Sequence, residues 1–316
     1  MKLQKTKFHY FLLFWVLMTG CINENLSECG EVVMWYFDYP YNSASFQDRI
    51  ERVNVGIYST DGILVESRQI EKDSLEAFRR QQGMPGMKVT LPLGEYTAVF
   101  WGNAHVKTKL DGWNNRNQGR VYHPDLGSIT NYVDSDDSLY YAQQERFELK
   151  ENTGPVKYIV HFEPGHINFE ISVLGLKNLA VTPAPGTIPY IRMDRLDCET
   201  YDFNMNPVPA GEFTFYPSSK GYDAVRDLLT FCTKVHRMGN DNPVTISLID
   251  QITDSALQSI ILKEYIIRYA QYKIIPQKEL TIYITFEIKK KNVADVEIII
   301  HPLPWNKVNV SPITKP

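Results

Sequence analysis

The stretch Leu-Thr-Ile-Tyr-Ile-Thr-Phe-Glu-Ile-Lys, at residues 280–289, decides the fold class of this chain. Apolar side chains stand at every second position, from Leu280 through Ile284 to Ile288, with threonine, tyrosine, glutamate or lysine between them. Alternation with a period of two residues is typical of a β-strand that buries one face and exposes the other. Residues 280–289 therefore predict a strand, which needs partner strands elsewhere in the chain.

The same alternation recurs along most of the sequence. It is clear in residues 52–58, 166–174 and 244–249, and the Asp-Gly pair at 61–62 predicts a tight turn into a partner strand. Only residues 73–82 and 260–272 show the spacing of short helices. Many short strands with few helices favour β-sandwiches over an α/β fold, because an α/β fold requires regular helical crossovers.

The Glu-Pro-Gly sequence at residues 163–165 is the expected boundary between two domains, because a fresh alternating series begins at His166. We therefore expect an all-β chain of two tandem β-sandwich domains, at residues 31–164 and 165–316, with one or two short helices. Residues 102–125 are rich in Gly, Asn and Asp, which predicts a long surface loop. Residues 223–237 are predicted to form one long strand.

The N-terminus has the layout of an export signal. Lys2, Lys5 and Lys7 precede an apolar run at residues 11–18, and Thr-Gly-Cys follows at residues 19–21. The apolar core is about half of the ~20 residues that span a bilayer, so a transmembrane anchor is disfavoured. A cysteine directly after a small-residue cleavage site resembles the lipobox of bacterial lipoproteins. The resemblance implies a signal peptide at residues 1–20, a diacylated Cys21 as mature N-terminus, and a tether at residues 21–30.

The charge balance argues against nucleic acid as a partner. The chain has 33 Lys+Arg and 37 Asp+Glu. Without Lys2, Lys5 and Lys7 the balance becomes 30 against 37, a formal charge of −7. Nucleic-acid phosphates require Lys/Arg-rich faces, and this mildly acidic sequence has no basic cluster.

The remaining cysteines are Cys29, Cys198 and Cys232. Exported proteins form disulfides, so a bridge between Cys198 and Cys232 is one reading of the two cysteines in strand-like stretches. The other reading is that both are small buried apolar side chains.

No motif for an enzyme or a cofactor stands out, so we expect no catalytic residue, no cofactor and no metal. Residues 134–138, Asp-Ser-Asp-Asp-Ser, offer oxygen ligands, but Leu139 stands where a calcium loop needs glycine. A solvated acidic loop is therefore the favoured interpretation. Aromatic residues near expected loops are the candidates for a binding surface, namely Tyr39, Tyr41, Trp113 and Tyr122.

Three stretches together resemble one family. They are Leu-Ser-Glu-Cys at residues 26–29, Val-Asn-Val-Gly-Ile-Tyr at 53–58 with Asp-Gly at 61–62, and Leu-Pro-Leu-Gly-Glu-Tyr-Thr-Ala-Val-Phe-Trp-Gly-Asn at 91–103. The last is the most specific, because it is similar to the family's strand-turn-strand that ends in Trp-Gly-Asn. The chain resembles the FimB-type fimbrial anchor and accessory lipoproteins of the Bacteroidales.

This resemblance implies two transthyretin-like domains in a non-catalytic, lipid-anchored outer-membrane subunit of a type V-like pilus. Such a subunit ties the filament to the membrane through Cys21, helps to limit its length, and binds pilins by strand donation. Residues 282–288 or 296–300 could line or fill the groove, unless both are ordinary core strands. A clear acidic export signal after Cys21 is lacking, so surface-exposed and periplasm-facing positions both stay open. The alternative is a surface lipoprotein adhesin that binds glycan or host protein.

Overall fold

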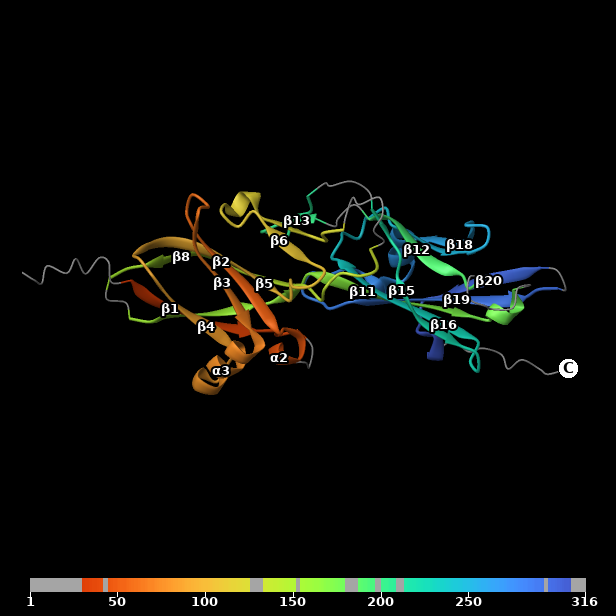
Figure 1. Ribbon diagram of the computed structural model, residues 1–316, viewed down its shortest axis with the longest axis horizontal. Coiled ribbons are helices and arrows are strands. Elements are labelled where there is room, and N and C mark those ends of the chain that lie inside the picture. The colour runs from red at the N-terminus through yellow and green to blue at the C-terminus, as the bar shows by residue number, and fades with distance from the viewer. Residues whose placement is uncertain are drawn as a thin grey trace, which may run out of the picture.

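The computed structural model describes residues 30–41, 45–125, 133–151, 154–179, 187–196, 200–208, 213–292 and 295–307. The molecule is elongated, with strands of the N-terminal half at one end and strands of the C-terminal half at the other (Figure 1). The prediction of an all-β fold is confirmed. The described residues contain three short α-helices, one more than the upper number expected: α2 (Phe46–Arg49), α3 (Lys72–Gln82) and α4 (Leu262–Arg268).

The N-terminal half is a sandwich of a three-stranded and a five-stranded sheet. In spatial order the three-stranded sheet contains β4 (Gly86–Leu91), β1 (Glu31–Asp38) and β9 (Val156–His161). The five-stranded sheet contains β10 (Glu163–Pro164), β8 (Tyr140–Leu149), β5 (Gly94–Gly102), β2 (Arg52–Ser59) and β3 (Leu64–Glu71), also in spatial order. Trp35 of β1 fills the space between the sheets and meets the rings of Phe100 and Phe147 edge-on, at 5.7 Å each. Such edge-to-face contacts add to the stabilisation from burial alone.

The C-terminal half is a second sandwich, and the stretch at residues 280–289 belongs to one of its interior strands. One sheet contains β15 (Ser218–Asp223), β16 (Leu228–His236), β11 (His166–Leu174), β19 (Thr281–Lys290) and β20 (Val296–His301), and the other β14 (Phe213–Phe215), β12 (Tyr190–Leu196), β17 (Thr245–Ile249) and β18 (Ala256–Ile261). β19 runs parallel to β11 and antiparallel to β20. Its apolar residues, Ile282, Ile284, Phe286 and Ile288, are at most 1% exposed.

The prediction of a long surface loop at residues 102–125 is wrong. This region contains β6 (Lys109–Asp111), the 3-10 turn η2 (Arg116–Gln118) and β7 (Arg120–Tyr122). β7 pairs on its other side with β13 (Thr200–Asp202), so a third, small sheet joins the two halves. Strands of three residues are too short to show an alternating pattern, and the partner strand comes from far along the chain.

Two further expectations need correction. The strand expected at residues 223–237 is interrupted by a turn, because the Asp223 carboxylate accepts hydrogen bonds from the N–H groups of Val225 and Arg226. Helix α2 was not expected, although Ser45 and Asp48 form a capping box at its N-terminus. A four-residue helix is too short for helical periodicity to reveal it.

His166 lies where the two halves meet. Its ring is buried, its Nδ1 lies 2.9 Å from the carbonyl oxygen of Leu139, and its ring contacts Tyr140 at 5.3 Å. Since the carbonyl can only accept, Nδ1–H is the donor. Burial away from water lowers the pKa of His166 to about 4, because the charged imidazolium is poorly solvated there.

This burial predicts a loss of stability in mild acid. Between pH 6.5, the ordinary pKa, and about 4, the unfolded chain binds a proton at His166 that the folded chain does not. Lowering the pH through this window should therefore remove about 3 kcal/mol of unfolding free energy through His166 alone. Urea unfolding at pH 7, 5.5 and 4.5 measures the loss. His166→Gln keeps a donor toward Leu139 without titrating, and an equally steep loss in that variant would contradict the assignment.

Candidate functional site

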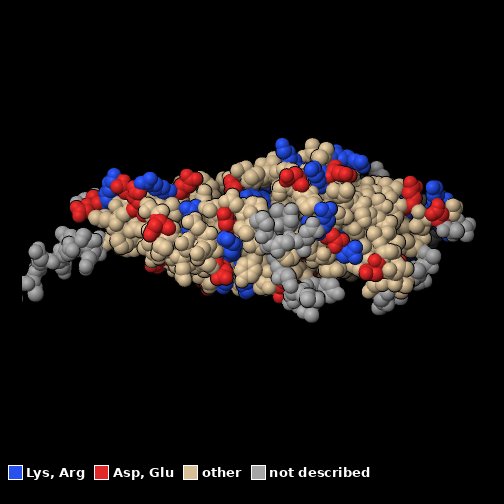
Figure 2. Space-filling model, turned by 90° about the horizontal axis from the view of Figure 1, so that it is seen from above, with Lys and Arg blue, Asp and Glu red and all other residues tan. Residues whose placement is uncertain are grey.

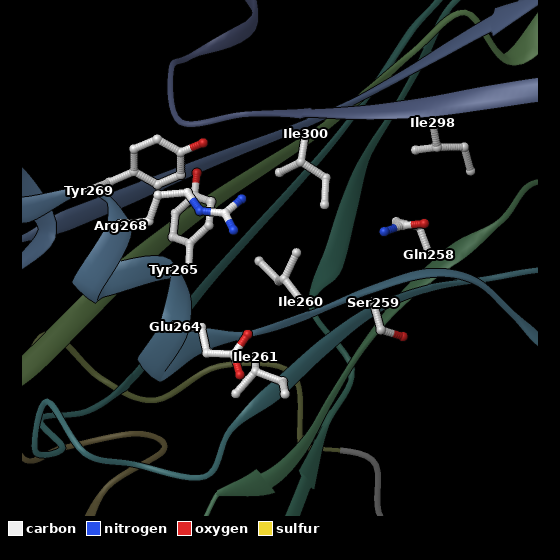
Figure 3. A pocket seen from close by; sticks show the side chains of 10 residues that line it. All are labelled: Gln258, Ser259, Ile260, Ile261, Glu264, Tyr265, Arg268, Tyr269, Ile298 and Ile300. Atoms are coloured by element: carbon white, nitrogen blue, oxygen red, sulfur yellow. The ribbon is translucent and has the colours of Figure 1, made fainter.

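The C-terminal sandwich is open between the edges of its two sheets (Figure 3). β18 ends the four-stranded sheet and β20 ends the five-stranded sheet. The hollow between them has a volume of about 420 Å³. Its walls come from β18, from α4 with the residue after it, and from β20: Gln258, Ser259, Ile260, Ile261, Glu264, Tyr265, Arg268, Tyr269, Ile298 and Ile300. We call this hollow the β18–β20 groove.

Apolar side chains form the floor of the groove. Ile298 and Ile300 stand opposite Ile288 and Phe286 of β19 and pack against the C-terminal core, yet they stay half-buried. On the other wall Ile260 is 8% exposed and Ile261 is 46% exposed. The core of this sandwich is therefore not closed on the β18–β20 side.

Helix α4 closes one end of the groove with tyrosines. The apolar spacing in residues 260–272 predicted a helix, and α4 confirms it. The Tyr265 hydroxyl donates a hydrogen bond to the carbonyl of Tyr283 at 2.7 Å, and the rings of Tyr269 and Tyr272 pack against Tyr265. Burial raises the pKa of Tyr265, so its hydroxyl stays protonated at physiological pH.

Two opposite charges stand on the rim of the groove. Glu264 and Arg268 are four residues apart on α4 and both are exposed. Figure 3 shows both side chains beside the apolar floor. Neither forms an ion pair with another residue in the described part of the chain. A carboxylate and a guanidinium are therefore available to side chains of an incoming molecule.

β20 also differs in its sequence and surroundings from two other edge strands, β3 and β4. β3 is protected by charge, with ion pairs from Glu66 to Arg68 and from Glu71 to Arg52, and α3 lies beside β4 (Figure 1). β20 contains three consecutive isoleucines at 298–300 and pairs only with β19 among the described strands. An apolar edge with unpaired backbone groups is a template for another strand.

The two stretches expected near a binding groove therefore differ. Residues 282–288 lie in the interior strand β19, whereas two residues of the stretch 296–300, Ile298 and Ile300, line the groove. The sequence signals for the groove were the helical spacing of 260–272 and the isoleucine run of 298–300. They could not be connected without knowing that β18 and β20 end their sheets on the same side.

The four aromatic candidates do not gather on one surface. Tyr39 is 3% exposed and packs against Tyr41 and Tyr140 in the N-terminal core. Trp113 is half-buried against Phe203, 4.8 Å between rings, and Tyr122 is half-buried in β7. A binding role for these residues stays a prediction.

The cysteine predictions fall largely outside the described residues. Cys21 and Cys198 both lie there, whereas Cys232 of β16 is half-buried and free. The lipidation and the disulfide therefore stay predictions. Within the described ranges no helix is long and apolar enough to cross a membrane.

The acidic stretch at residues 134–138 is not the solvated loop that was expected. The Asp136 side chain is fully buried, and Asp137 accepts hydrogen bonds from backbone N–H groups. No group of three or more His, Cys, Asp or Glu residues able to hold a metal occurs in the part of the chain that the structure describes.

Comparison with known proteins gives one family. The family model for Mfa2, the fimbrillin-A associated anchor proteins Mfa1 and Mfa2, matches residues 26–311. The fimbrial anchor protein Mfa2 from Porphyromonas gingivalis has a similar structure, with 17% identity, a TM-score of 0.64, and coverage of 87% of this chain and 98% of that one. A Bacteroides ovatus protein described as an adhesin also has a similar structure, with 18% identity and a TM-score of 0.66. The match covers 87% of this chain and 95% of that one. No curated protein matches the chain.

The half-buried isoleucines on the edge strand β20 predict weak self-association. At high protein concentration, β20 edges of two molecules should pair, and a lysine at position 298 should prevent this by placing a charge in the apolar floor. Sedimentation of the wild type and of Ile298→Lys over a hundredfold concentration range measures the effect. Val65→Lys, on the charged edge strand β3, is the matched control. Equal association of all three proteins would show that the β20 edge does not mediate self-association.

Proposed function

The chain belongs to the Mfa2 family of fimbrillin-A associated anchor proteins, and from this premise we propose that it is a lipid-anchored accessory subunit of a fimbria. In this proposal Cys21 carries the lipid in the outer membrane, and the protein ties the filament to the membrane and limits its length. The observation that carries the proposal is the β18–β20 groove, an apolar gap between two sheet edges that the fold leaves open.

The two ends of the molecule support this role. β1 starts at Glu31, at the left end in Figure 1, and β18 and β20 lie near the right end. A lipid on Cys21, ten residues before Glu31, would hold the first end near the membrane. The groove would then face away from the membrane, where a filament subunit can reach it.

We propose that the partner is an extended strand donated by a pilin. β18 and β20 are six residues long, so each edge can pair with about 20 Å of an added strand. Main-chain hydrogen bonds to such an edge supply affinity, and alternate side chains supply specificity. Apolar side chains of the donated strand would fill the space between Ile260 and Ile300, and charged ones would meet Glu264 and Arg268.

The alternative, a glycan-binding adhesin, has less support. Flat exposed aromatic rings are the usual platform for sugars, and Tyr39 and Trp113 are packed against other rings instead. On the face shown in Figure 2, acidic and basic side chains are interspersed. That face therefore lacks the extended basic surface that an acidic polymer would require.

The lipid is tested by Cys21→Ala. Without the thiol no acyl chain can be attached, so the variant should move from the membrane fraction to the soluble fraction. Each buried CH₂ of a lipid chain contributes about 0.8 kcal/mol to membrane binding, so removing the chains should abolish sedimentation with membranes. Cys232→Ala is the control. Retention of Cys21→Ala in washed membranes would refute the anchor.

The groove is tested in cells that lack the native gene. Complementation with Ile300→Lys should leave the amount of membrane-bound protein unchanged while cell-attached fimbriae fall about tenfold or more, because an unpaired charge in the apolar floor weakens strand binding by over ~1.4 kcal/mol. Electron microscopy counts and measures the attached filaments. Val65→Lys should restore wild-type numbers and lengths. Normal fimbriae with Ile300→Lys would remove the groove from the proposal, and normal fimbriae in the deletion strain would remove the anchor role itself.

A further inference from the structure

A segment of the N-terminal half lies in the C-terminal sandwich. Residues 133–136 precede β8 in the sequence, yet Val133 is 3% exposed within the C-terminal core and its backbone bridges to Phe215. The Asp136 N–H donates to the carbonyl of Lys234 at 2.8 Å, and the Lys234 N–H donates to the Ser135 hydroxyl at 3.0 Å. The pairing between β15 and β16 extends along β16 only as far as Cys232, which stands opposite Ser218. Residues 134–136 therefore continue the edge of this sheet where β15 stops.

A segment of the C-terminal half packs against the outer face of the N-terminal sandwich. β13 pairs with β7, and Tyr201 and Phe203 are at most 1% exposed in a cluster with Trp101 on the outer face of the N-terminal sheet. The Tyr141 hydroxyl donates to the carbonyl of Phe203 at 3.0 Å. A Cβ at Gly119 would lie 2.3 Å from the Phe203 ring, so only glycine fits beneath it.

Asp137 fixes the first crossing segment to the N-terminal half. One oxygen of its carboxylate, Oδ2, accepts hydrogen bonds from four consecutive N–H groups, those of residues 105–108, at 2.9–3.0 Å. Charged acceptors make the stronger hydrogen bonds of proteins, and several converging on one oxygen hold it in place. On the other side, the Thr233 hydroxyl donates to the carbonyl of Asp134 at 2.6 Å. The segment is therefore bonded to both halves within four residues.

We propose that this reciprocal exchange interlocks the two halves into a single cooperative unit. Two domains joined only at Gly165 would share a modest surface and move relative to each other. Here separation would uncover Val133, Tyr201 and Phe203 and break the bonds of Asp137 or of residues 134–136. A pull between the β1 end and the groove end is therefore carried by two crossing segments as well as by the connection at Gly165. The inference rests on these contacts and not on the anchor role.

Scanning calorimetry of the full mature chain carrying Cys21→Ala tests the interlock. We expect one unfolding transition with a calorimetric to van't Hoff enthalpy ratio near one. In the same background Phe203→Ala and Asp137→Ala should split it into two transitions, because each weakens one link between the halves. Phe147→Ala is the matched control: Phe147 is buried in the N-terminal core with Trp35 and Tyr96. It should lower the midpoint of a transition that stays single.

Asp137→Asn is a milder variant for use if Phe203→Ala or Asp137→Ala does not fold. It keeps the shape of the side chain and an acceptor oxygen but loses the charge. It should broaden the transition and raise amide hydrogen exchange at residues 105–108 at least tenfold. Two transitions in the parent protein would overturn the interlock. So would single transitions in Phe203→Ala and Asp137→Ala that match Phe147→Ala, or unchanged transition width and exchange in Asp137→Asn.

Discussion

A strand at the edge of a sheet exposes N–H and C=O groups that have no partner, and the whole architecture of this protein depends on how those edges are treated. β3 carries paired charges, and β4 is flanked by α3. The edge beyond β15 is extended by residues 134–136. β18 and β20 receive no such protection and leave the C-terminal core open between them. Apolar side chains of both strands therefore border an open groove on this side of the sandwich.

The open edges of β18 and β20 suggest which surface of the protein could serve a fimbrial role. Membership in the Mfa2 family gives a fimbrial accessory role, but a family match does not say which surface binds. The apolar floor at Ile260, Ile298 and Ile300, with Glu264 and Arg268 on its rim, supplies a surface suited to an extended peptide. This surface and β1 lie toward opposite ends of the molecule (Figure 1).

The sequence predicted features that depend on local pattern. Alternation identified β19 and β2, and helical spacing identified α3 and α4. In each of these elements the buried face repeats with a regular period along consecutive residues. Prediction from the sequence failed where a strand or a carboxylate is stabilised by a partner that lies far away in the chain. β7 is three residues long and pairs with β13. The carboxylates of Asp136 and Asp137 accept hydrogen bonds from β16 and from residues 105–108. Local charge density therefore suggested solvation, and only the fold shows what those carboxylates contact.

The exchange of segments has a consequence for the order in which the protein can be completed. Synthesis from the N-terminus makes β2, β5 and β8 well before Tyr201 and Phe203. Until residue 203 has emerged, the cluster around Trp101 and Tyr141 lacks two of its aromatic rings. Contacts that close over such sequence separations form slowly, and incomplete halves expose apolar surface meanwhile. The first half of this protein is thus completed only after part of the second half has been made.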